Sequence, residues 1–235
     1  MNTVIVRYRF HILAVAGLAA VVFVGFAKTY YLKTLFDGPP LAQAAHLHGI
    51  LATAWIALHY TQARLVAAHR VDVHRRLGIL AACVALLLAV QVVSLAIANA
   101  GAGHAPPGRD PLQFLSVPLG TTTMFTLFVG SALALRRNCE WHKRLMLLGT
   151  MTLLVPAMGR LDAQVMVPLG LPRLVLAAAV TFGFIAWAWA DDWRRLGRVH
   201  PAYVVGGIAL LASMPLRRWI GFTDAWLPIA RWLVG

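Results

Sequence analysis

Apolar residues fill the chain in seven long stretches that are separated by short polar connections. A helix that crosses a membrane needs about 20 mainly apolar residues, and six of the stretches meet this requirement clearly. The seventh is shorter, contains Gly206 and Gly207, and ends at Pro215, so six spans are the alternative to seven. The predicted spans cover residues 10–27, 45–68, 77–99, 114–135, 144–163, 173–190 and 201–216.

Little sequence remains outside these stretches, and the connections between them are short. The longest leftover segment, residues 217–235, predicts an amphipathic helix at the membrane interface, bent or broken at Pro228. Its apolar side chains recur at helical spacing, at Phe222, Trp226, Ile229 and Leu233. We therefore expect a single transmembrane domain over residues 1–235, all-α in class, a polytopic helical bundle without a soluble domain.

Composition supports this expectation and excludes other classes of protein. Of the 235 residues, 60% are hydrophobic and only 12% are charged, against roughly 25% charged residues in a soluble domain. A soluble enzyme, a disordered chain and a disulfide-stapled secreted module are thereby excluded. The net charge of +13 would suggest nucleic acid in a soluble protein. Here the basic residues lie mainly between the apolar stretches, so the expected partner is the lipid bilayer and not nucleic acid.

The distribution of Lys and Arg predicts the orientation. The N-terminal tail and the connections after spans two, four and six hold 12 of the 21 basic residues, and the opposite side holds 8. Because cytoplasmic loops carry the excess of positive charge, the N-terminus is predicted to be cytoplasmic. Three arginines near the C-terminus fit this orientation poorly, so a last segment that does not cross is the alternative.

A basic cluster with a histidine begins each odd-numbered span, at His11, His74, His142 and His200. The strings His74-Arg-Arg-Leu and His142-Lys-Arg-Leu match closely and suggest duplication of a helical hairpin. Such residues either anchor helix ends by reaching the headgroups, or form a site for an anionic group such as a heme propionate or a phosphate. The sequence leaves both interpretations open.

The second span, residues 45–68, differs from the others because polar residues lie on two nearly opposite sides of it. One stripe holds His48 and His59, which are 11 residues and almost three turns apart. The other holds His46, Thr53 and Arg64. A helix facing lipid could not carry polar groups on both sides, which predicts that this helix lies at the centre of the bundle.

Ionisable residues inside a span indicate function by default, and histidine is both the commonest metal ligand and a proton relay. His48 and His59 are therefore the leading cofactor ligands, about 16 Å apart along the helix at 1.5 Å per residue. One b-type heme would take either histidine together with a second axial ligand such as Met124 or Met158. Arg64 and Arg160 would pair with the acidic groups of the cofactor.

A metal ion is the second possibility for the cofactor. His46, His48 and Asp162 could hold a Cu or Zn ion, and His46 and Asp162 could alternatively carry protons. Together with Tyr31 and Arg160 they predict a polar pocket at the external end of the bundle.

Several strings resemble an uncharacterised family of bacterial polytopic inner-membrane proteins of unknown function. They are His46-Leu-His-Gly49, His74-Arg-Arg-Leu-Gly78 and Trp141-His-Lys-Arg-Leu-Met146, with Pro156-Ala-Met-Gly-Arg160 after them. The resemblance covers residues from about 10 to about 225 and implies a multi-pass helical protein of the bacterial inner membrane, with no established activity. A weaker similarity is to b561-type membrane cytochromes, from which the chain departs because it lacks a second set of deep histidines.

The functional interpretation that follows is a heme- or metal-binding protein for electron transfer, quinone chemistry or redox sensing. Its partner would be a quinone or another redox protein. No P-loop, GxGxxG or HExxH motif occurs, so no catalytic residue is assigned. A small-molecule or ion transporter is the alternative, with threonines 121–123 and Gln91 lining a polar path. A membrane assembly or scaffold factor without a cofactor is the third.

Overall fold

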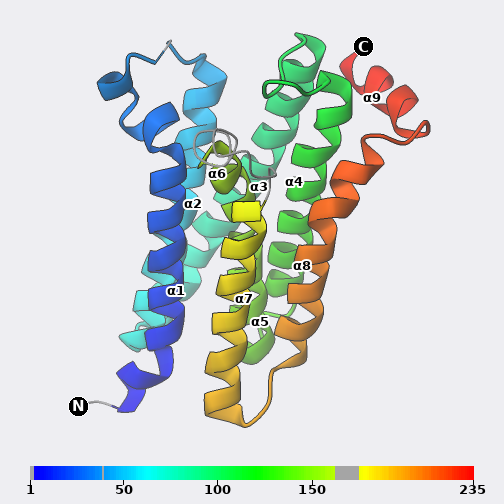
Figure 1. Ribbon diagram of the computed structural model, residues 1–235. Coiled ribbons are helices and arrows are strands. Elements are labelled where there is room, and N and C mark those ends of the chain that lie inside the picture. The colour runs from blue at the N-terminus through cyan, green and yellow to red at the C-terminus, as the bar shows by residue number, and fades with distance from the viewer. Residues whose placement is uncertain (1–2, 39, 162–174) are drawn as a thin grey trace.

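The computed structural model describes residues 3–38, 40–161 and 175–235, and the regular elements in these ranges are all helices (Figure 1). Two short elements, the π-helical η1 (Ala27–Tyr31) and the 3₁₀-helical η2 (Lys33–Phe36), follow the first helix. The α-helices are α1 (Thr3–Phe26), α2 (Gln43–Ala67), α3 (Val71–Gly101), α4 (Pro111–Ala134), α5 (Cys139–Met151), α6 (Leu154–Leu161), α7 (Val175–Leu196), α8 (Pro201–Ile220) and α9 (Trp226–Val234).

The long helices run side by side and alternate in direction (Figure 1). We call one end of the bundle the basic end, defined by the start of α1 and the connections 68–70, 135–138 and 197–200. The other end, with η1, η2, the α3–α4 connection and α9, is called the far end. Seven helical segments overlap the seven predicted spans, with α5 and α6 together covering the fifth.

Five segments of the described chain are long and apolar enough to cross a membrane. Their outer faces carry exposed apolar side chains such as Ile79, Leu86 and Val90 on α3, as a helix facing lipid requires. The protein is therefore a multi-pass membrane protein built as a helical bundle. α2 and α8 lie alongside the five but are more polar. The five segments are Arg9–Tyr31, Val71–Gly101, Pro111–Ala134, Cys139–Leu161 and Val175–Leu196.

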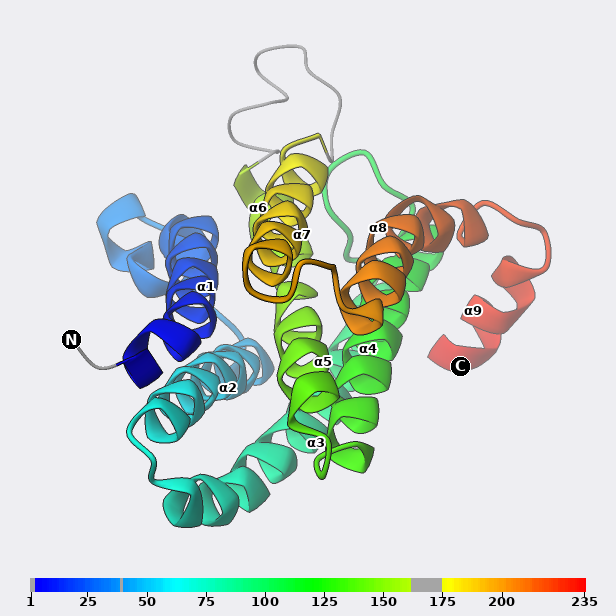
Figure 2. The same ribbon diagram turned by 90° about the horizontal axis from the view of Figure 1, so that it is seen from below.

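The centre of the bundle is occupied by α5, and the prediction that the second span lies there is wrong. Figure 2 shows α5 surrounded by other helices, and all residues from Leu147 to Thr152 are buried. α2 instead keeps an exposed stripe that includes Leu47, Ile50 and Thr53. The Thr53 hydroxyl forms hydrogen bonds with Tyr31 and with a carbonyl of its own helix. A polar side chain on this outer side of α2 is therefore satisfied without being enclosed by other helices.

The fifth span is broken between α5 and α6, at Thr152 and Leu153. A proline ring clashes with the carbonyl four residues earlier and supplies no N–H, and Pro156 stands four residues after Thr152. The Thr152 hydroxyl donates to the Gly149 carbonyl at 2.7 Å and so satisfies an acceptor at the break. Pro156 therefore interrupts this span one turn before its own position.

The C-terminal segment divides between two helices. α8 continues to Ile220, and α9 packs on α3 and α4, where the Trp226 indole N–H donates to the Leu112 carbonyl at 2.8 Å. The predicted break at Pro228 is absent, since Pro228 occupies the first turn of α9, where a missing N–H costs nothing. The chain turns earlier, between Gly221 and Ala225.

Candidate functional site

His59 faces the central helix α5 and is fixed there by Thr150. The Nδ1 atom of His59 lies 2.7 Å from Oγ1 of Thr150, and the indole N–H of Trp55 donates to the same oxygen at 3.2 Å. Thr150 in turn donates to the Met146 carbonyl at 3.1 Å. Trp55 and Thr150 are both buried. One hydroxyl thus joins two side chains of α2 to the centre of the bundle.

This arrangement favours one tautomer of His59. With the single hydroxyl proton of Thr150 directed at the Met146 carbonyl, Oγ1 accepts from the imidazole. Nδ1 of His59 therefore carries the proton, and Nε2 keeps a free lone pair in the neutral ring. A histidine whose Nδ1–H is held by an oxygen, with Nε2 open, has the form in which histidines ligate metals.

His142 of α5 has the same form. Its Nδ1 lies 2.8 Å from the Ala132 carbonyl of α4, and a carbonyl only accepts, so Nδ1 again carries the proton. His142 is close enough to His59 for their charges to interact. Nε2 of each ring has no hydrogen-bond partner among the described residues. Two imidazoles on α2 and α5 are thus held in the same tautomer on neighbouring helices.

A third histidine, His74 of α3, completes the cluster. Its ring meets that of His142 edge-on, with centroids 6.4 Å apart, and its Nδ1 is buried without a partner in the described chain. The Gln62 side chain of α2 donates to the His74 carbonyl at 3.1 Å. The two matching strings of the sequence repeat therefore meet in space through their histidines. We call His59, His74 and His142 the histidine cluster.

Arg64 follows His59 by five residues toward the basic end and leaves α2 about 140° further around the helix axis. Its guanidinium donates to the Tyr60 hydroxyl at 3.3 Å and is exposed. No carboxylate of the described chain pairs with Arg64, so its charge is available to an acidic group on a ligand.

Arg144, a basic residue of the repeat, has carboxylate partners within the protein. Arg144 is 1% exposed and forms a two-bond ion pair with Asp192 of α7, which is 0% exposed; the Nε contact is 2.9 Å. It also reaches the Glu140 carboxylate at 2.5 Å, and Lys143 reaches the same carboxylate at 2.7 Å. An anion from outside therefore finds no free charge at Arg144.

Two further histidines of the repeat extend this ionic network. The backbone N–H of His200 donates to Asp192 at 3.0 Å, and the His200 ring caps α8 by accepting from the Ala202 N–H at 3.1 Å. Burial lowers the pKa of His200, and the charge of Arg144 lowers it further. Tyr203 lies under the Arg144 guanidinium, and its hydroxyl is 3.5 Å from Nε2 of His11. The network ties α1, α5, α7 and α8 together at the basic end.

The remaining predicted site residues lie at the far end, away from His59. His46 is exposed, and its ring lies 6.0 Å from that of Tyr30, whereas His48 is close enough to Arg160 for their charges to interact. Nδ1 of His48 is buried without a partner in the described ranges. Arg160 donates to the Pro156 carbonyl at 2.9 Å and lies over the Phe26 ring at 4.1 Å.

The structure therefore separates residues that the sequence analysis grouped. Arg64 and Arg160 stand at opposite ends of the bundle and could not serve the same cofactor. His46 and His48 are two residues apart on a helix, about 200° around its axis, so their rings leave α2 in different directions. Asp162 lies outside the described residues. No three His, Cys, Asp or Glu side chains come together as a metal site within the described ranges.

Polar residues expected to line a transport path are bonded to backbone carbonyls. The hydroxyls of Thr121, Thr122 and Thr123 donate to the carbonyls four residues earlier, at 2.8, 2.9 and 3.0 Å. The Gln91 side chain donates to the Ala44 carbonyl at 2.8 Å. These contacts join and shape helices in the manner usual for polar residues in membranes, and none of them needs a solute.

Sequence reasoning missed two partners at the site. Asp192, the carboxylate partner of Arg144, lies just beyond the predicted end of the sixth span and was therefore not considered. An acidic residue at the edge of an apolar stretch could have indicated a functional or paired carboxylate. Thr150 carried no signal, because a threonine in an apolar helix usually bonds to its own backbone.

Comparison with protein-family models, curated proteins and solved structures finds no match for this chain.

Proposed function

We propose that the protein binds one b-type heme through His59 and His142 and serves in membrane electron transfer or redox sensing. The observation that carries the proposal is the shared state of these two rings. Each donates its Nδ1–H to a fixed oxygen and leaves Nε2 open, and the rings belong to different helices. A heme held by two histidines would need one open imidazole nitrogen from each of them, which His59 and His142 could supply.

The surroundings of the two rings support heme over a metal ion. A structural or catalytic zinc site takes at least three protein ligands, and the described residues form no such group. A heme brings four nitrogen ligands of its own and asks the protein for two. When bound, a b-type heme supplies one-electron chemistry. The buried, unpartnered Nδ1 of His74 beside His142 provides a hydrogen-bonding group for the same ligand.

Arg64 is the propionate partner in this proposal. It is exposed and carries no carboxylate partner in the described chain. It leaves α2 about 140° around the axis from His59, so its long side chain would have to reach around the helix toward the ligand. Arginine pairs with carboxylates through charge-assisted, often bidentate, hydrogen bonds. Arg160 stands too far along the bundle for this role and belongs to the surroundings of His48.

The proposal also includes the number of spans, the membrane and the orientation of the protein in it. We infer seven spans in a bacterial inner membrane, with the N-terminus in the cytoplasm, so that the basic end faces the cytoplasm in agreement with the distribution of Lys and Arg. A heme near this end would exchange electrons with a membrane quinone or with another redox protein. The alternating direction of the helices and the opposite positions of the two termini support an odd number of crossings.

The test is the heme content of purified variants. We expect His59→Ala and His142→Ala each to lower the heme content at least tenfold, and His48→Ala to leave it within twofold of wild type. His104→Ala, in the exposed α3–α4 connection, is the matched control for loss of a histidine. Loss of heme from His48→Ala together with retention by His59→Ala would contradict the assignment.

A further inference from the structure

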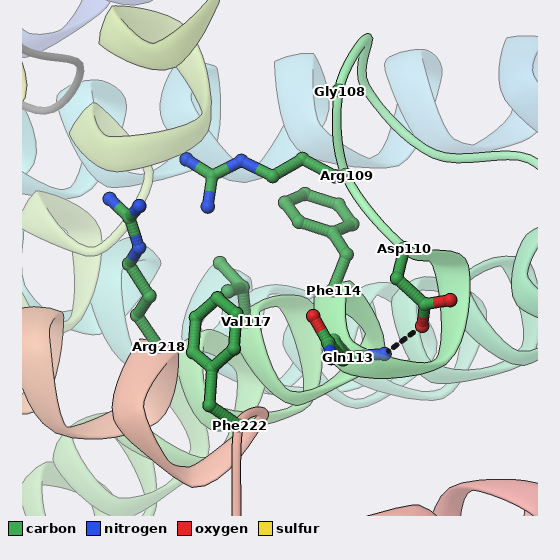
Figure 3. A pocket seen from close by; sticks show the side chains of 8 residues that line it. All are labelled: Gly108, Arg109, Asp110, Gln113, Phe114, Val117, Arg218 and Phe222. Carbon is green, nitrogen blue, oxygen red and sulfur yellow. Dashed lines mark hydrogen bonds between the residues drawn. The ribbon is translucent and has the colours of Figure 1, made fainter.

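The far end of the bundle contains two adjoining hollows that the proposed heme site does not use. One, of about 290 Å³, lies between the start of α4 and the end of α8 (Figure 3). The other, of about 550 Å³, lies along α7 and α8. Arg218 and Phe222 line both, so the two hollows adjoin, and we call them together the groove.

The hollow beside α4 is built to receive negative charge. Figure 3 shows the guanidinium groups of Arg109 and Arg218 turned toward the same space, above the rings of Phe114 and Phe222. No carboxylate pairs with Arg218 among the residues that the structure describes. Asp110 also lines this hollow, but its Oδ1 accepts from the Gln113 N–H at 2.9 Å as the cap of α4. Arg218 thus brings a charge that no described carboxylate compensates into a hollow that Arg109 also lines.

A third arginine adds to the positive charge of this region. Arg217 is 4% exposed and packs against Gly120 of α4, where an added Cβ would come within 2.8 Å of the Cβ of Arg217. Both of its terminal nitrogens are buried without a partner in the described ranges. A buried guanidinium without a counter-charge is costly, and a bound anion nearby lowers that cost.

The second hollow has the opposite character. It is lined by apolar side chains, among them Leu211, Met214 and Trp219, and its only charged lining residue is Arg218 at the junction. The groove as a whole therefore suits a molecule with an anionic head and an apolar tail.

The depth of the groove indicates the source of that molecule. Trp219 and Trp232 at this end are 64% and 80% exposed, and exposed tryptophans mark the headgroup level of a bilayer. Arg218 lies beside Trp219, at the level of lipid phosphates, and the apolar hollow runs along helices that face the acyl chains. We infer that this groove binds an anionic phospholipid, with its phosphate at Arg218 and an acyl chain along α7 and α8.

The experiment is native mass spectrometry of the delipidated full-length protein, to which phosphatidylglycerol or phosphatidylcholine is added in detergent. Wild type is expected to retain phosphatidylglycerol at least fivefold more than phosphatidylcholine. Arg218→Gln should abolish this preference. Arg231→Gln, which removes an exposed arginine of α9 at the same end, is the matched control and should preserve it. Equal preference in Arg218→Gln and wild type overturns the inference.

A second pair of variants tests the apolar hollow without touching a charge. Ala178 lines the hollow and Ala179 is exposed beside it. Ala178→Trp is expected to lower retention of phosphatidylglycerol at least threefold, and Ala179→Trp to leave it unchanged. Equal retention by the two variants contradicts the placement of the chain. Displacement of phosphatidylglycerol by millimolar inorganic phosphate would show a site for free anions and would overturn the lipid assignment.

Discussion

Arg144 and Asp192 form a fully buried ion pair that ties the central helix α5 to α7. Removing one partner of such a pair leaves an uncompensated buried charge and lowers the free energy of unfolding by about 3–5 kcal/mol. Because Glu140 remains beside Arg144 and compensates part of its charge, we expect a loss at the lower end of this range. We therefore expect Asp192→Ala to lower the free energy of unfolding in mixed micelles by about 3 kcal/mol.

Asp191 is the matched control for this variant. It pairs with Arg195 one turn along the same helix and is less buried, and pairs of this kind contribute at most about 1 kcal/mol. Asp191→Ala should therefore cost less than a third as much. Equal losses would show that the buried pair has no special role.

Thr150 supports both Trp55 and His59, and removing its hydroxyl leaves two donors unpaired. An unpaired buried donor costs roughly 1–3 kcal/mol, so Thr150→Val should destabilise the protein by at least about 2 kcal/mol. The matched control is Thr181→Val, because the buried hydroxyl of Thr181 has no partner in the described chain. Its loss should be neutral or stabilising. Destabilisation by both variants to the same extent would contradict the assigned role of Thr150.

Gly25 is required by the close approach of α1 to α6. A Cβ at this position would lie 2.5 Å from the Ala157 carbonyl oxygen, and backbone cannot yield as a flexible side chain can. We expect Gly25→Ala to destabilise the protein by about 1–3 kcal/mol. Gly183→Ala on α7 meets nothing within 4 Å and should gain up to about 1 kcal/mol from helix propensity. Thermal unfolding in detergent measures both, and a stable Gly25→Ala variant would show that the helices can separate freely.

The two cysteines report the orientation of the bundle. Cys139 is exposed at the basic end, and Cys83 is exposed on the lipid-facing part of α3. With the basic end in the cytoplasm, a membrane-impermeant maleimide should label Cys139 in inverted vesicles and not in intact cells. His104→Cys, made in a Cys139→Ser background, should show the reverse. Labelling of Cys139 from outside would invert the orientation.

The sequence predicted the positions of the helices well, because the thickness of a bilayer fixes the length of an apolar run. It failed on the environment of α2, since hydropathy cannot distinguish a polar residue that faces protein from one such as Thr53 that bonds to Tyr31. The break at Thr152 follows from Pro156 four residues later, because the effect of a proline on its helix is local.

The site was predicted in part. His59 stood out as an ionisable residue inside a span, but its partner Thr150 is 91 residues away and on another helix. Pairing between distant helices depends on how they pack, which no local pattern records. For the same reason His142 was assigned to the sequence repeat and not to the ligand set, although its ring lies beside His74.

The absorption spectrum of the protein, purified in mild detergent and recorded before and after reduction with dithionite, is the direct test of heme binding. We expect a Soret band that sharpens and shifts on reduction, with one heme for each chain, and loss of the band in His142→Ala. A protein that stays colourless when expressed and purified with heme in excess, while remaining folded and monodisperse, would contradict the proposed function.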